Sequence, residues 1–115
     1  MNVSKDLTAA SATPLVLAIL KEADSYGYSI IKKVKELSGN EILWTEGMLY
    51  PVLHRLEDQK LIEAYWQSSD KGRDRKYYRI TEVGREELEL QLKQWQMVHS
   101  TIEKSRESSH RDKEE

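Results

Sequence analysis

The sequence contains no cysteine, and this absence excludes several kinds of chemistry at once. A chain of 115 residues without a thiol forms no disulfide, binds no zinc through thiolates and carries no cysteine nucleophile. This composition fits a reducing compartment, so we expect a cytoplasmic protein. The length is that of one domain with extensions.

Long apolar runs are also missing. The run LVLAIL at 15–20 has six residues, whereas a helix needs about 20 apolar residues to span a bilayer. The same run is too short for a convincing signal peptide. We therefore expect no membrane segment and no membrane partner.

Catalytic and metal-binding patterns are absent as well. The sequence has no glycine-rich phosphate loop and no nucleophile motif. His54, His99 and His110 fall on different expected elements, without the short helical spacing of a metal-binding pair. Acidic residues crowd one expected helix, where solvation and ion pairing explain them better than acid–base catalysis. We expect no enzyme, no metal site and no cofactor.

Basic charge is present, but it is concentrated in one segment. The net charge is only −2, which does not by itself indicate a nucleic-acid-binding protein. Residues 71–79, KGRDRKYYR, nevertheless hold five basic residues against a single acidic residue, Asp74. A polar turn at 68–73 would place much of this charge at the tip of a hairpin. Arginine and lysine in such a place suit phosphate groups.

Hydrophobic periodicity predicts two helices in the first third of the chain. Residues 15–22, LVLAILKE, are expected to form a mostly buried helix, with a strand as the alternative. Ser11 or Thr13 would cap this helix, and Pro14 would lie in its first turn. A second helix should begin near Tyr26, end at SGN (38–40), and carry one apolar face made of Ile30, Ile31, Val34 and Leu37.

The rest of the chain predicts a third helix, a hairpin and a long final helix. Thr45 is expected to cap a helix whose apolar positions are Leu49, Val52, Leu53 and Leu56. Residues 61–67 and 75–80 should form a β-hairpin, and Thr81 should cap the last helix. The predicted fold is mainly α with a small β-hairpin, a winged helix-turn-helix with a long C-terminal dimerisation helix. Its parts would be a DNA-binding domain at 7–81, the dimerisation helix at 82–104 and a disordered tail at 105–115.

Three segments together identify a family resemblance. YGYSIIKKVKELSG (26–39), EGMLYPVLHRLEDQKLIE (46–63) and RKYYRITEVGRE (75–86) strongly resemble the PadR-like family of bacterial transcriptional regulators. The resemblance implies a homodimer that binds double-stranded DNA of inverted-repeat type, usually as a repressor released by a small molecule. The single C-terminal helix looks like the compact branch of the family. Met48 departs from the pattern, because many relatives carry a small hydroxyl residue there.

The expected DNA-binding residues fall into two groups. Outward positions of the third helix are candidates for contacts in the major groove, with Tyr50 suited to a phosphate and His54 to a base edge. Cations of the hairpin tip, with a lysine of the second helix, are candidates for phosphate contacts. The complete set is Lys33, Met48, Tyr50, Pro51, His54, Arg55, Lys71, Arg73, Arg75, Lys76 and Tyr77.

The final helix carries a seam with spacings of four, three, four and three residues, which is typical of a coiled coil. The expected dimer interface comprises Leu15, Leu88, Leu92, Trp95, His99 and Ile102. The segment QWQMV around Trp95 is similar to family members whose paired tryptophans bind flat aromatic drugs at the dimer centre. The resemblance therefore implies a planar aromatic effector near Trp95, Leu92, Met97 and His99. Plain core packing is the alternative role of Trp95.

A second class of function is compatible with the same fold. A winged helix can bind another protein after losing its contacts with DNA. The basic hairpin tip favours DNA, because an acidic or shortened tip would be expected in a protein-binding module.

Overall fold

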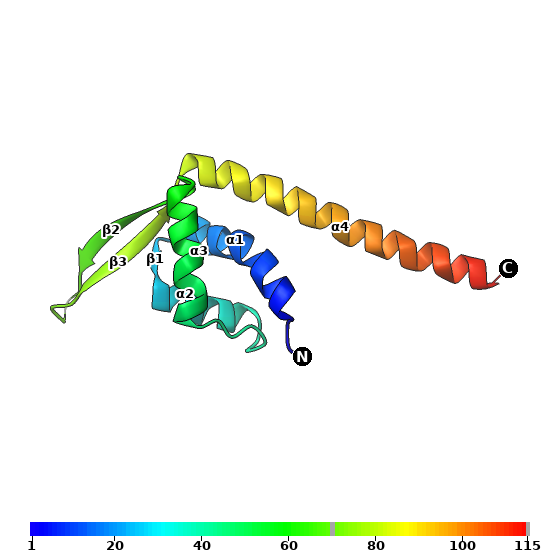
Figure 1. Ribbon diagram of the computed structural model, residues 1–115, viewed down its shortest axis with the longest axis horizontal. Coiled ribbons are helices and arrows are strands. Elements are labelled where there is room, and N and C mark those ends of the chain that lie inside the picture. Colours follow the sequence, from blue (N-terminus) through cyan, green and yellow to red (C-terminus); the bar gives the residue numbers. More distant parts are fainter. Residues whose placement is uncertain (70, 115) are drawn as a thin grey trace.

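The computed structural model describes the backbone of residues 1–69 and 71–114 and the side chains of residues 1–69 and 71–108. The molecule is elongated, with principal extents of 69 × 30 × 21 Å. Figure 1 shows the first three helices and the sheet gathered at one end, with the last helix extending away from them. The fold class predicted from the sequence, mainly α with a winged helix-turn-helix and a long C-terminal helix, is confirmed. The elements are α1 (Lys5–Glu22), β1 (Ser25–Tyr26), α2 (Gly27–Leu37), α3 (Glu46–Asp58), β2 (Ile62–Ser68), β3 (Asp74–Ile80) and α4 (Glu82–Glu114).

Helix α1 begins earlier than the sequence predicts. The cap is Ser4, whose Oγ accepts a hydrogen bond of 3.2 Å from the Leu7 N–H, and neither Ser11 nor Thr13 has this role. The alanine-rich segment 8–12 favours helix strongly enough that Pro14 lies inside the helix, where it forfeits one hydrogen bond. The alternative of a strand at 15–20 is wrong.

The caps of α2 and α3 are largely as predicted. Gly39 and Asn40 have φ angles of 61° and 69°, in the left-handed region, and they end α2 where expected. Thr45 caps α3, because its Oγ1 accepts a hydrogen bond of 3.2 Å from the Met48 N–H. Leu37 was expected on the buried face of α2, but it lies at the last helical position and is exposed. All four predicted apolar positions of α3 are buried: Leu49, Val52, Leu53 and Leu56.

The sheet has three antiparallel strands in the order β1-β3-β2, where the sequence predicts only the β2–β3 hairpin. Strand β1 is two residues long and pairs Ser25 with Tyr78 and Tyr26 with Tyr77. Tyr78 and Ile80 share the buried face of β3, as predicted. On the opposite face the Tyr77 ring lies 5.4 Å from that of Tyr26 and 5.8 Å from that of Tyr65, measured between ring centres. This tyrosine cluster attaches the short strand to the hairpin.

Helix α4 begins against the domain and then leaves it (Figure 1). The Gly84 N–H donates a hydrogen bond of 3.0 Å to Thr81 Oγ1, which confirms Thr81 as the cap. A Cβ at Gly84 would lie 2.1 Å from the Leu61 carbonyl oxygen, so only glycine allows this close approach. Leu88 is 2% exposed and belongs to the core, which also includes buried residues of α1, α2, α3 and the sheet.

The structure continues α4 beyond 104, the boundary predicted from the sequence. Residues 105–114, predicted as a disordered tail, are helical as far as Glu114, and Glu115 lies outside the described residues. Glutamate, lysine and arginine favour helix, and Arg106 pairs with Glu103 one turn earlier at 3.1 Å. Among the helices described, none is long and apolar enough to cross a membrane.

Candidate nucleic-acid interface

Helix α3 presents one polar face to solvent. Its leucine and valine side chains pack inward, which leaves Tyr50, Pro51, His54 and Arg55 exposed. Met48 differs from these, because it is half-buried and packs partly against the core. The face available for a partner is therefore centred on Tyr50, Pro51 and His54.

The position of Tyr50 depends on a glycine of α2. A Cβ at Gly27 would lie 2.8 Å from the Tyr50 hydroxyl oxygen and 3.1 Å from the ring carbon that bears it. The tyrosine ring therefore covers the start of α2, and its hydroxyl lies beside the backbone of that helix. This contact links the two helices of the helix-turn-helix.

Two other predicted residues of the helices, Arg55 and Lys33, have different surroundings. Arg55 Nη2 donates a hydrogen bond of 3.1 Å to Thr13 Oγ1, so Arg55 joins α3 to α1. Lys33 is exposed on α2. Arg55 is thus directed toward its own chain, while Lys33 has its ammonium group in solvent.

The turn between β2 and β3 is held by its own backbone. The Ser69 N–H donates to the Arg73 carbonyl at 2.9 Å, and the Gly72 N–H donates to the Ser69 carbonyl at 3.0 Å. Gly72 has a φ angle of 78°, which favours glycine at this position. Lys71, Arg73 and Arg75 are exposed around this turn, so the basic tip predicted from the sequence is present. We call β2, β3 and their turn the wing.

The three predicted residues of β3, Arg75, Lys76 and Tyr77, are held by different contacts. The Arg75 guanidinium lies 4.5 Å from the centre of the Tyr26 ring. Lys76 Nζ lies 3.5 Å from Glu57 Oε1 of α3, which neutralises part of its charge. Tyr77 is half-buried within the tyrosine cluster. Arg75 is therefore better placed than Lys76 or Tyr77 to meet an external phosphate.

Two tyrosines of the sheet have perturbed pKa values. The Tyr65 hydroxyl donates a hydrogen bond of 2.7 Å to Asp24 Oδ2, and this bond raises the pKa of Tyr65. Burial raises the pKa of Tyr78, while the Lys76 ammonium opposes the shift. Both shifts favour the neutral phenol over the charged phenolate.

A groove separates the wing from the start of α2 and α3. Its volume is about 360 Å³, and Trp66, on the wing, is 68% exposed beside it. Trp66 is not among the residues predicted from the sequence, although side chains alternate between the two faces of a strand, which places Trp66 on the face that bears Ile62. The groove is lined by Tyr26, Gly27, Tyr50, Trp66, Asp74, Arg75, Lys76 and Tyr78.

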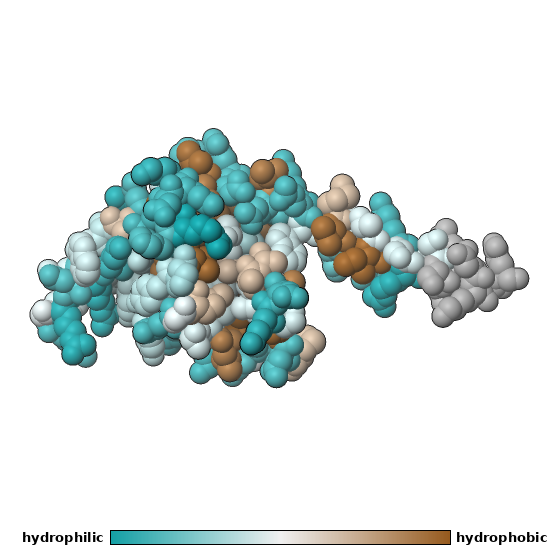
Figure 2. Space-filling model, viewed as in Figure 1, coloured by the Kyte–Doolittle hydropathy of each residue, from teal (hydrophilic) through white to brown (hydrophobic). Residues whose placement is uncertain are grey.

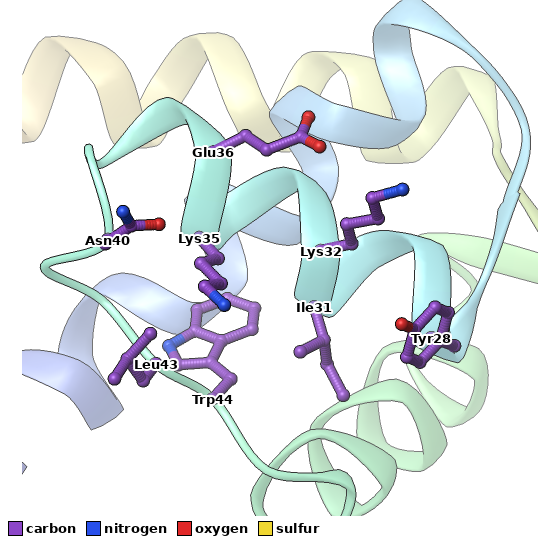
Figure 3. Close-up of a pocket in the computed structure, with 8 residues that line it drawn as sticks. All are labelled: Tyr28, Ile31, Lys32, Lys35, Glu36, Asn40, Leu43 and Trp44. Atoms are coloured by element: carbon purple, nitrogen blue, oxygen red, sulfur yellow. The ribbon is translucent and has the colours of Figure 1, made fainter.

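A second groove, of about 480 Å³, lies along α2 (Figure 3). Lys32, Lys35 and Glu36 extend from the helix, while Leu43 and Trp44 come from the loop that leads to α3. The Trp44 indole N–H is buried and has no hydrogen-bond partner among the described residues. The two lysines give this flank of the helix-turn-helix a basic rim.

The predicted dimer seam on α4 is divided into a covered and an uncovered part. Leu88 is buried within its own chain, and Leu15 on α1 is half-buried. Farther along, Trp95 is 37% exposed and Ile102 is 54% exposed, and Figure 2 shows hydrophobic side chains on α4 outside the domain. The uncovered seam consists of Leu92, Trp95, His99 and Ile102.

Only part of the predicted effector site comes together within one subunit. Trp95 lines a shallow hollow of about 170 Å³ together with Gln94 and Val98. Leu92 and His99 lie on the same side of the helix as Trp95, one turn away in each direction. Met97 lies on a different side, because side chains two positions apart point in different directions from a helix. Met97 therefore faces away from the Trp95 hollow of its own subunit.

Among the described residues there is no cluster of three or more potential metal ligands. His54 lies on α3 and His99 on α4, while the side chain of His110 lies outside the described residues.

The helix-turn-helix and wing agree with comparisons to known proteins. Residues 16–90 match the transcriptional regulator PadR-like family. An uncharacterised protein of Lysinibacillus sphaericus is 35% identical over 88% of this chain and 93% of its own length. The transcriptional regulator YqjI of Escherichia coli is 32% identical over 76% of this chain, which spans only 41% of that longer protein. The solved structure of a transcriptional regulator from Clostridium thermocellum has a TM-score of 0.81 and 29% identity, covering 89% of this chain and 96% of the other. This chain therefore belongs to the PadR-like family of transcriptional regulators.

Proposed function

We propose that this regulator represses transcription as a homodimer that binds an inverted-repeat operator. The observation that carries the proposal is that Tyr50, on the exposed face of α3, and Arg75, at the basic end of the wing, line the same groove. In a winged helix these surfaces reach a major groove and the neighbouring phosphates. The three relatives described above are bacterial, so the expected site of action is the cytoplasm.

The uncovered seam of α4 supports the proposed dimer. Leu92, Trp95 and Ile102 form an apolar stripe that no other part of the described chain covers. A second copy of α4 would bury these side chains and place two helix-turn-helix units on one duplex. A two-fold dimer matches an operator with two-fold symmetry.

Release by a planar aromatic molecule is the regulatory part of the proposal. Two Trp95 indoles brought together at a dimer axis would offer flat apolar faces for stacking. The molecule would need to bind one arrangement of the two wings more tightly than another, since equal affinity for both shifts nothing.

The proposed function is tested by fluorescence anisotropy with a labelled duplex from the chain's own promoter region and a random duplex of equal length. We expect tighter binding to the promoter, and affinity for both should fall steeply with salt. The salt slope is the slope of the logarithm of the affinity against the logarithm of the salt concentration. Replacing Arg73 or Arg75 by alanine should reduce its magnitude by about one per lost phosphate contact. Lys76→Ala should change it less, because Glu57 already pairs with Lys76.

Lys93→Ala is the matched control, because it removes an equal charge from an exposed position of α4 far from the wing. It should leave the salt slope at the wild-type value. A wild-type chain that binds neither duplex would overturn the proposal and favour a protein-binding winged helix.

A further inference from the structure

We propose that the groove between the wing and α3 holds the sugar–phosphate backbone of one DNA strand, and that Trp66 packs against its deoxyribose rings. This inference rests on the proposed binding of DNA and adds a contact residue that the basic tip and the face of α3 do not include.

The register of the wing determines where Trp66 points. Trp66 pairs directly with Lys76, so the two side chains share one face of the hairpin. That face is directed toward α3, because Lys76 contacts Glu57 and Tyr78 on the same face is buried. Trp66 lies nearer the tip than Tyr78, beyond the part of the sheet that the helices cover.

Side chains on this face of β2 become more exposed toward the tip of the wing. Ile62 is buried, Ala64 is half-buried and Trp66 is exposed, although all three alternate onto one face of the strand. A tryptophan side chain offers about 150–250 Å² of contact area. In this chain that area remains in water beside a groove whose opposite side is Tyr50 of α3.

The charges around the groove favour an occupant that is only partly anionic. Arg75 and Lys76 supply positive charge, but Lys76 is paired with Glu57. Asp74 adds a negative charge, and its carboxylate accepts a hydrogen bond of 3.0 Å from the Ser68 hydroxyl. A free multivalent anion would find little uncompensated charge here. A DNA strand instead alternates a phosphate with an uncharged sugar, which matches cations placed next to a large apolar ring.

The groove is also continuous with the surface expected to meet DNA. Tyr50 belongs to both, because its side chain lines the groove while Pro51 and His54 follow it on the exposed face of α3. A strand lying in the groove would pass from the wing directly to this face. The Tyr50 hydroxyl can donate to a phosphate oxygen on the way.

A contact between an indole and a sugar has a recognisable thermodynamic signature. It displaces no condensed counterion, so its contribution should not depend on salt, in contrast to that of Arg73 or Arg75. It also carries no base information, so it should stabilise specific and random duplexes equally.

The test measures anisotropy of the promoter and random duplexes with full-length wild-type, Trp66→Ala and Trp66→Phe chains at several salt concentrations. We expect Trp66→Ala to weaken both complexes about tenfold with an unchanged salt slope. Trp66→Phe should keep most of the affinity. Leu90→Ala, which trims an exposed apolar residue of α4, is the matched control and should bind like wild type.

A second measurement does not depend on the stability of the alanine variant. Acrylamide quenching of wild type minus that of Trp66→Phe reports Trp66 alone, and saturating duplex should protect this component. Wild-type binding with no loss in Trp66→Ala, no protection of Trp66, or a changed salt slope in Trp66→Ala would each overturn the inference. Failure of the wild-type chain to bind either duplex would instead overturn the proposed function on which the inference rests.

Discussion

Leu88 and Ile102 lie on the same stripe of α4, yet Leu88 is 2% exposed and Ile102 is 54% exposed. The first turns of the helix are covered by the domain of the same chain. There, Lys21 Nζ of α1 also lies 3.5 Å from Glu89 Oε1. The later turns have no comparable cover within the described chain. One apolar stripe therefore stabilises the subunit at its start, and in our proposal it joins two subunits farther along. A mutation in either part should affect a different measurable property.

The largest effect is expected at the covered end. Leu88→Ala should lower the free energy of unfolding by about 2 to 5 kcal/mol, because it opens a cavity in the core. Urea unfolding followed by circular dichroism at a fixed chain concentration measures this loss. Leu90→Ala removes the same atoms from an exposed position and should cost about 0.5 kcal/mol or less. Equal losses in the two variants would contradict the assignment of Leu88 to the core.

The uncovered end should control association instead. Ile102→Glu places a charge within the proposed dimer seam, so we expect monomers at micromolar concentration with helix content close to wild type. Light scattering gives the mass of each variant. Leu90→Glu is the control, because Leu90 lies outside the stripe, and it should remain dimeric. A monomeric wild-type chain would contradict the proposed dimer.

A smaller effect should appear at the middle of the seam. If paired Trp95 side chains form a stacking site, Trp95→Ala should weaken binding of a planar cationic dye while the chain stays folded and dimeric. Fluorescence titration of the dye measures the affinity. Trp66→Ala removes an indole from the wing and should leave dye binding unchanged. An unaltered dye affinity in a dimeric Trp95→Ala variant would show that Trp95 serves only in core packing.

The smallest effect is a decrease of Tm at alkaline pH, and it arises from Tyr78 in the buried core of the domain. Burial raises the pKa of Tyr78 above its usual value of 10.0, so the folded state holds the phenolic proton more tightly than the unfolded state. This contribution is fully present below pH 10 and is lost as the pH rises through the folded pKa. The Tm should therefore fall above pH 10, and less in Tyr78→Phe. Tyr28→Phe, at an exposed position of α2, should follow the wild-type profile.

The sequence predicted the features that depend on local chemistry. Thr45 and Thr81 are caps because a hydroxyl before a helix accepts a backbone N–H, and Gly39 ends α2 because it tolerates a positive φ. The buried stripe of α3 followed from its spacing. These signals are contained in a few neighbouring residues, so they could be identified without tertiary information.

Features that depend on tertiary contact were missed or misplaced. Strand β1 has only two residues, too few to show alternation, and it forms because Tyr26 packs on Tyr77. The periodicity of α4 predicts a single interface, because spacing alone does not tell which turns of the helix the domain covers. The sequence does not predict the ion pair of Lys76, because its partner, Glu57, comes from another element.

Counting the chains bound to one inverted-repeat duplex from the promoter region is the most direct test of the proposed dimer. Mass photometry of the complex should give two chains per duplex for wild type. Ile102→Glu, if folded, should bind far more weakly, because each subunit then acts alone. One wild-type chain per duplex, or an Ile102→Glu variant that binds as tightly as wild type, would contradict the claim that α4 joins two DNA-binding domains.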